Sequence, residues 1–138
     1  MRAENFSWSD GIRLVVNEQE FDLHNCFDFR SFDYNVANRT ASLKWCRGSG
    51  EWIDRNLAAG VRIEFFDVDY LKIRPRDPEL PFTEDDCLAS FGYDCDEDWT
   101  NGQFWMDGPA DPTWRWSFLF QSGAEIVIGG VRAVVSVD

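Results

Sequence analysis

The stretch TEDDCLASFGYDCDEDW, residues 83–99, carries seven carboxylates in seventeen positions and no Lys or Arg. Acidic side chains at this density could bind a cation, serve as a catalytic acid pair or attract a basic partner. The alternating acids of 94–98 are typical of the first half of an EF-hand calcium loop, in which the sixth position is Gly and the twelfth a carboxylate. This chain has Trp99 and Trp105 at those positions. An EF-hand is therefore excluded, and an irregular, weak cation site is the only such interpretation left open.

The acidic stretch belongs to a longer segment that supplies almost all of the excess negative charge. The 138 residues carry a net charge of −12, and eleven of the 25 acids lie between Arg76 and Arg115, where there is no Lys or Arg. This distribution predicts that the segment folds into one negative surface. The excess charge also disfavours nucleic acids and anionic membranes as partners, because both require a basic surface. The eleven acids are Asp77, Glu79, Glu84, Asp85, Asp86, Asp94, Asp96, Glu97, Asp98, Asp107 and Asp111.

The residue types and motifs of the sequence give little support for catalysis. A glycosidase needs two carboxylates at a defined separation, and the sequence offers many acids with no basis for choosing two. The only histidine, His24, would have to serve any Ser- or Cys-based triad, and a hydrogen-bonded turn histidine is its more ordinary role. There is no Gly-rich phosphate loop, nucleophile elbow or HExxH motif. We therefore expect a protein that is not an enzyme and has no cofactor.

The cysteines predict a reducing compartment and no structural metal. The four of them form no CxxC pair and match no zinc-binding spacing; His24 with Cys26 would offer two ligands at most. The first five residues lack the apolar region of a signal peptide, and no apolar run is long enough to span a membrane. We expect a cytoplasmic protein whose thiols are reduced and pack as small hydrophobes. The cysteines are Cys26, Cys46, Cys87 and Cys95.

The elements that must position these residues are mostly β-strands, because apolar residues recur with a period of two. In 113–121, four aromatic side chains fall on one face: Trp114, Trp116, Phe118 and Phe120. Two further β-branched runs, 124–128 and 131–137, follow after Ser122-Gly123 and Gly129-Gly130, and both dipeptides suit tight turns. The pattern predicts a three-stranded antiparallel meander at the C-terminal end.

Upstream, the same reasoning predicts strands at 12–17, 61–68 and 70–74, and a hairpin of 27–34 with 39–46. Two short helices are also expected. One covers 51–59, and the other begins at Thr83, with acids in its first turn, and ends at Gly92. We therefore predict a single domain over 1–138, mainly β (α+β), built as an antiparallel β-sandwich of about eight to ten strands with one or two short inserted helices.

The tryptophans divide into two groups. Alternation predicts that Trp45, Trp114 and Trp116 lie in the core. Trp99 and Trp105 flank the acidic stretch without clear periodicity, so they either pin a long loop to the sheet or are exposed. Exposed aromatics beside carboxylates are a common composition of protein-binding hot spots.

The order of features resembles that of small β-rich bacterial proteins, several uncharacterised and some classed as immunity proteins of polymorphic toxin systems. The resemblance rests on LHNC (23–26) leading into a hairpin, on VRIEFFDVDYLKIRP (61–75), on a Pro-rich acidic connector and on FLFQSGAEIVIGGVRAVV (118–135). It covers about two thirds of the chain as an order of strands. The resemblance implies a compact cytoplasmic β-sandwich that has no catalytic activity and binds a protein partner.

Together these observations predict a non-catalytic acidic interaction protein whose 77–111 segment docks a basic protein partner, and the resemblance implies an immunity-like role. The alternative is a β module that binds a small molecule, a carbohydrate or a cation through Trp99, Trp105 and the nearby acids. A third interpretation is a structural domain that its acidic loop keeps soluble. The predicted partner-binding residues are Glu84, Asp85, Asp86, Asp94, Asp96, Glu97, Asp98, Trp99 and Trp105.

Overall fold

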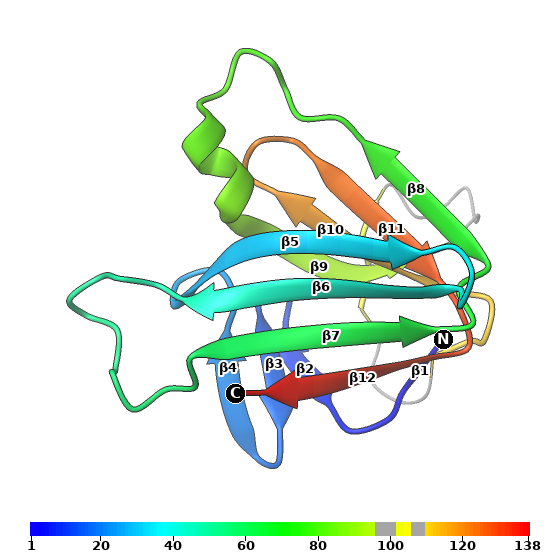
Figure 1. The fold of residues 1–138 in the computed structure, drawn as a ribbon, viewed down its shortest axis with the longest axis horizontal. Coiled ribbons are helices and arrows are strands. Elements are labelled where there is room, and N and C mark those ends of the chain that lie inside the picture. The colour runs from blue at the N-terminus through cyan, green and yellow to red at the C-terminus, as the bar shows by residue number, and fades with distance from the viewer. Residues whose placement is uncertain (96–101, 106–109) are drawn as a thin grey trace.

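The computed structural model describes residues 1–95, 102–105 and 110–138, and its described residues form strands in three sheets with one short helix (Figure 1). The five-stranded sheet has the order β1-β12-β7-β6-β5, the four-stranded sheet β8-β11-β10-β9, and the three-stranded sheet β2-β3-β4. The elements are β1 (Arg2–Ala3), β2 (Ser7–Asp10), β3 (Arg13–Val16), β4 (Gln19–Asp22), β5 (Phe27–Asn35), β6 (Thr40–Arg47), β7 (Gly60–Phe66), β8 (Tyr70–Arg74), the 3₁₀-helix η1 (Phe82–Asp86), β9 (Leu88–Asp94), β10 (Arg115–Phe120), β11 (Glu125–Gly129) and β12 (Arg132–Val137).

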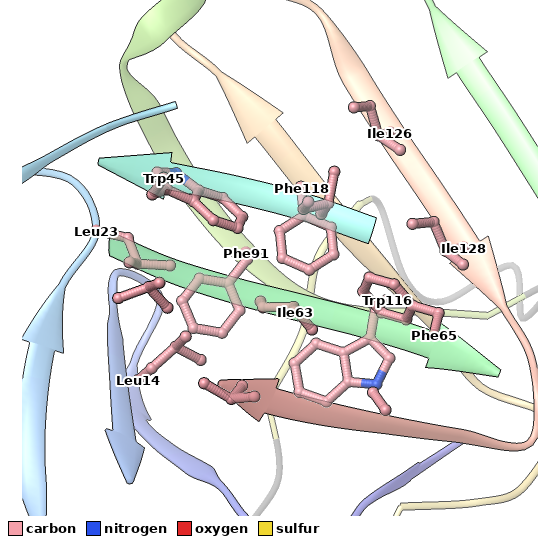
Figure 2. Packing of buried hydrophobic residues seen from close by; sticks show 14 of the residues in the cluster. Leu14, Leu23, Trp45, Ile63, Phe65, Phe91, Trp116, Phe118, Ile126 and Ile128 are labelled. Carbon is pink, nitrogen blue, oxygen red and sulfur yellow. The ribbon is translucent and has the colours of Figure 1, made fainter. Parts of the chain in front are cut away.

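Aromatic side chains join the five-stranded and four-stranded sheets (Figure 2). Phe118 of β10 lies 6.1 Å from Trp45 of β6 and 6.0 Å from Phe65 of β7 between ring centroids. Phe29 of β5 lies 4.6 Å from Phe120 of β10. Alternate residues of β6 and β7 are buried here, as expected when one face of a sheet covers a core.

The small N-terminal sheet extends the same core. Leu14 and Phe21, on β3 and β4, are buried with it. Trp8 of β2 packs edge-on against Trp116 at 4.4 Å and against Tyr93 at 5.0 Å between ring centroids. This sheet therefore packs its aromatic side chain against the β9–β10 pair.

The prediction of a mainly β domain is confirmed, and so are the 27–46 hairpin and strands close to 12–17, 61–68 and 70–74. The core positions of Trp45 and Trp116 are also confirmed, while Trp114 is partly buried against the core. Strands β1, β2, β4 and β9 were not predicted, because their short segments do not alternate clearly. The described residues hold twelve strands, more than the eight to ten expected.

The predicted C-terminal meander is wrong in its third strand. β10 and β11 pair as expected across the Ser122-Gly123 turn, but β12 leaves that sheet and pairs with β7. Gly129-Gly130 makes the crossing, and neither residue has a positive φ. A side chain at Gly130 would come within 2.9 Å of the Phe66 carbonyl, so the glycines are needed for close packing between the sheets and not for a tight turn.

The predicted helix at 51–59 is also wrong, because this segment consists of turns. Its backbone carbonyls are satisfied by arginines instead of by helical amides. Arg47 donates to the carbonyls of Arg55 and Leu57, and Arg55 donates to those of Gly48 and Gly50. Ile53 is the buried residue of the segment, and Ala58 packs against the core.

Only the start of the second predicted helix is helical. The 3₁₀-helix η1 ends at Asp86, and the residues from Leu88 to Asp94 form β9. Leu88, Phe91 and Tyr93 are buried as β9 pairs with β10 along its length. Tertiary pairing has overridden the local helix signal here. No helix among the described residues is long and apolar enough to cross a membrane.

Candidate interaction surfaces

The described acids of the 77–111 segment do not form one surface. Glu84, Asp85 and Asp86 lie in η1, before β9 begins, whereas Asp94 is the last residue of β9. A strand advances about 3.3 Å per residue, which puts Asp86 and Asp94 on the order of 25 Å apart. The expectation of a single negative surface is therefore wrong for these residues, because a whole strand separates them.

At its far end, Asp94 lies directly opposite Arg115 in the β9–β10 pair, so a base accompanies this acid. The predicted site residues Asp96, Glu97, Asp98 and Trp99 lie outside the described residues. Among the described residues, no cluster of three or more His, Cys, Asp or Glu side chains is placed to hold a metal ion.

The near end forms what we call the acidic arm, residues 75–87. Figure 1 shows it extending beyond the sheets as the loop after β8 and the coil of η1. Three backbone bonds fix the arm to the end of β10 and the β10–β11 turn. Asp77 N–H donates to the Ser122 carbonyl at 2.7 Å, Ser122 N–H to the Glu84 carbonyl at 3.2 Å, and Gln121 N–H to the Cys87 carbonyl at 2.9 Å. Ser122 is fully buried, so the arm is held at a defined point.

The single base of the acidic arm, Arg76, is consumed within it. Its Nε donates to both carboxylate oxygens of Asp85 at 3.0 and 3.1 Å, and its Nη2 donates to the Leu80 carbonyl at 2.7 Å. Its guanidinium also lies 4.4 Å from the ring centroid of Phe82. A hydrogen bond from Ser122, followed by Arg76, lowers the pKa of Asp85. Asp85 and Arg76 therefore stabilise the arm from inside.

The other four acids of the arm have no ion pair with any described residue: Asp77, Glu79, Glu84 and Asp86. The same short segment carries exposed apolar side chains. Phe82 is 80% exposed and Leu80 is 37% exposed. An exposed aromatic in a segment rich in carboxylates is the kind of surface that a complementary protein can desolvate and pair with.

His24 and Cys87 form a contact that could suggest a catalytic pair. The Cys87 Sγ lies 3.6 Å from His24 Nδ1, but the same Nδ1 lies 2.5 Å from the Leu88 carbonyl. A carbonyl only accepts hydrogen bonds, so Nδ1 carries the proton and cannot take one from the thiol. Burial, with the carboxylates of Glu84, Asp86 and Asp28, raises the pKa of Cys87. Cys87 is therefore a protonated thiol, which is a poor nucleophile.

Sequence patterns could not predict this contact, because 63 positions separate the two residues. Cys26, Cys46 and Cys87 are free thiols, and Cys46 is the exposed one.

Trp105 is the one described member of the predicted aromatic pair. It is 46% exposed and lines a groove of about 940 Å³ together with Trp8 and Tyr93. The nitrogen-bearing side of its indole lies directly over Gly11 and Gly92, where any β-carbon would overlap the ring. The position of Trp105 is therefore fixed by two glycines on different strands or turns, a role that its place in the sequence did not reveal.

Residues 1–3 and 6–10 supply much of the groove lining, and sequence reasoning did not identify them as a site. Met1, Arg2 and Ala3 line it, as do all four residues of β2. The apolar alternation of this segment is weak, so the only available signal was the aromatic pair Phe6 and Trp8.

The chain matches no protein-family model, no protein of curated function and no solved structure. The class that the fold and surfaces define is thus a small, mainly β domain with an acidic arm at one end of β9 and an aromatic groove near the other.

Proposed function

We propose that this chain is a non-catalytic interaction protein that docks a basic protein partner through the acidic arm. The observation that carries the proposal is the set of four arm carboxylates that have no ion pair with any described residue, in the same segment as the exposed Phe82. The proposed surface keeps Glu84, Asp85 and Asp86 from the sequence-based set. It adds four residues of the same arm: Asp77, Glu79, Leu80 and Phe82.

Two physical effects support such docking. The unpaired carboxylates attract a basic surface over a distance and so raise the association rate. Phe82 and Leu80 then supply apolar area, whose desolvation slows dissociation. The anchoring of the arm through Ser122 limits the entropy lost on binding, because the loop is already held in place.

The resemblance to immunity proteins of toxin systems supports the same kind of partner. A toxin that acts on nucleic acid needs a basic cleft, and an acidic arm with an apolar tip complements such a cleft. Under this proposal the protein covers the cleft and has no chemistry of its own.

The experiment compares two variants with equal charge changes. The arm variant carries Glu79→Gln, Glu84→Gln and Asp86→Asn; the control carries Glu18→Gln, Glu20→Gln and Glu51→Gln, all exposed and far from the arm in sequence. Association with a panel of purified basic nucleases is measured by surface plasmon resonance at low and physiological salt. The arm variant is expected to associate about 10-fold more slowly with the nuclease that binds, whereas the control changes less than about 2-fold.

Phe82→Ala separates the apolar contribution from the charges. It is expected to raise the dissociation rate by about 10-fold with little change in association, because truncation of a hot-spot aromatic costs more than about 1 kcal/mol. Equal losses in the arm and control variants would show that only net charge matters. That result, or unchanged kinetics in the arm variant, would remove the proposal.

A further inference from the structure

The groove beside Trp105 runs along two free sheet edges. β1 is the outermost strand of the five-stranded sheet and β2 is an outer strand of the three-stranded sheet, and among the described residues neither has a second partner strand. All four consecutive residues of β2 line the groove. Side chains on a strand alternate between faces, so a groove that reaches every residue lies along the backbone edge and not over one face.

The backbone of β1 shows which groups point to the groove. Arg2 N–H donates to the Val131 carbonyl at 3.0 Å, and Glu4 N–H donates to the Ala133 carbonyl at 3.0 Å. Backbone groups of alternate residues point to opposite sides of a strand. The N–H and carbonyl of Ala3, between these two residues, therefore point away from β12 and towards the groove that Ala3 lines.

The groove is also lined by closely packed aromatic side chains. Trp105 is held over Gly11 and Gly92, and Trp8 and Tyr93 are packed edge-on against each other. Burial raises the pKa of Tyr93 to about 12, so its hydroxyl stays a neutral donor and acceptor. Such a wall can accept alternate apolar side chains of an extended chain without rearranging.

The charges of the groove are nearly balanced, and one carboxylate stays exposed. The guanidinium of Arg2 is bound to Glu4 at 2.6 Å, and the Met1 amine donates to three backbone carbonyls, those of Asp111, Pro112 and Trp114. Asp10, at the end of β2, is paired with Arg13. Asp69 is exposed and makes no ion pair with any described residue, although its charge acts on the Met1 amine. The groove therefore offers one exposed carboxylate with which a Lys or Arg side chain can pair.

We propose that this groove binds an extended basic peptide segment, which adds as a strand beside β1, places apolar side chains against Trp105 and Trp8, and sets a Lys or Arg near Asp69. Binding uses backbone hydrogen bonds for affinity and the aromatic wall for side-chain preference. The site is separate from the acidic arm and does not depend on the function proposed for it.

A phage library of random decapeptides, selected against the full chain, is the probe. The enriched sequences are expected to alternate apolar residues with Lys or Arg. The best binder is then synthesised with N-methyl groups on one set of alternate backbone nitrogens, and a second version carries them on the intervening set. One version is expected to bind at least 10-fold more weakly than the other by fluorescence anisotropy, because only one edge of the peptide pairs with β1.

Two matched pairs of protein variants locate the site. Ala3→Pro removes the backbone N–H that faces the groove and leaves the bonds of Arg2 and Glu4 to β12 intact, whereas Ala3→Ser keeps that N–H. Trp105→Ala removes the aromatic wall, whereas Trp52→Ala removes a tryptophan that is 77% exposed outside the groove. Ala3→Pro and Trp105→Ala are each expected to weaken binding at least 10-fold, and their controls less than about 2-fold. Circular dichroism checks that each variant is folded.

Several outcomes would overturn the proposal. These are the absence of any enriched sequence, equal affinity for both N-methylated peptides, or binding that the charge variant of the acidic arm abolishes. Saturable binding of neutral disaccharides that depends on Trp105, with no peptide binding, would assign the groove to carbohydrate instead. The comparison of N-methylated peptides needs no protein variant, so the proposal stays testable even where Ala3→Pro fails to fold.

Discussion

The acidic arm and the groove are joined by the same strand but are built in opposite ways. The arm precedes β9 and combines unpaired charge with an exposed ring, whereas the groove lies near the far end of β9 and combines a cavity with nearly balanced charge. The arm is a continuous segment, 75–87. The groove is assembled from residues that are more than 100 positions apart, such as Ala3 and Trp105. The segment with the most concentrated charge is therefore not the part of the molecule that has space for a ligand.

The largest expected effect comes from a substitution in the core that supports both surfaces. Phe118 of β10 is fully buried, lies opposite Phe91 of β9, and contacts aromatic side chains from the five-stranded sheet. Phe118→Ala is expected to lower the free energy of unfolding by about 3–5 kcal/mol, because it loses apolar burial and leaves a cavity. Urea unfolding, followed by tryptophan fluorescence, measures this loss. A change below about 1 kcal/mol would mean that the two sheets do not depend on this contact.

A smaller effect separates the groove from the arm. Gly92→Ala places a methyl group where the nitrogen of the Trp105 ring lies, and its third neighbour is the Phe104 carbonyl at 3.0 Å. We expect a loss of about 1–3 kcal/mol in unfolding free energy from overpacking, and a red shift in fluorescence as Trp105 moves into solvent. Binding at the acidic arm should not change.

The double variant gives the control for this prediction. When Trp105 is already Ala, Gly92→Ala should cost much less than it does in the wild-type background, because the ring that it displaces is absent. Equal costs in both backgrounds would show that Gly92 is required for another reason, such as its pairing opposite Ser117.

The two surfaces also differ in how far the sequence predicted them. Period-two patterning gave the mainly β class and the 27–46 hairpin, because buried and exposed residues alternate there on a face that covers the core. Part of the arm was predicted from its charge alone. The groove could not be predicted in this way. Gly11 and Gly92 make room for the Trp105 ring because they have no side chain, and β1 contributes its backbone edge. Neither property appears in a residue-type pattern.

The crossing at Gly129-Gly130 illustrates the same limit. A pair of glycines between two β-branched runs is a good signal for a hairpin, yet here the pair lets the chain pass close to Phe66 and enter the other sheet. The separation of Glu84 from Asp94 has a similar cause. Eleven acids in one segment predict one surface only if the segment stays on one side of the molecule, and the strand β9 carries it across.

The smallest expected effect belongs to the arm alone. The pKa of Asp85 is lowered by the hydrogen bond from Ser122 and by Arg76, from an ordinary value of 3.8. A carboxylate whose pKa is lower in the folded state stabilises the fold above the pKa of the unfolded state, and that contribution is lost as the pH falls through the lowered value. The pair is partly exposed to solvent, so water screens it. Asp85→Asn should therefore lower the unfolding free energy by less than about 1 kcal/mol at neutral pH.

The difference between wild type and Asp85→Asn should shrink as the pH is lowered from about 7 to about 3, because the wild-type carboxylate begins to take up its proton. Asp67→Asn, at the exposed Asp67–Arg39 pair, is the matched control, since no hydrogen bond from a buried hydroxyl supports that carboxylate. Urea unfolding at both pH values measures the two differences. A difference for Asp85→Asn that is the same at both pH values would mean that the arm is fixed by its backbone bonds alone. Its docking surface would then persist without the internal ion pair, unlike the groove, whose wall depends on the fit of Trp105 against Gly92.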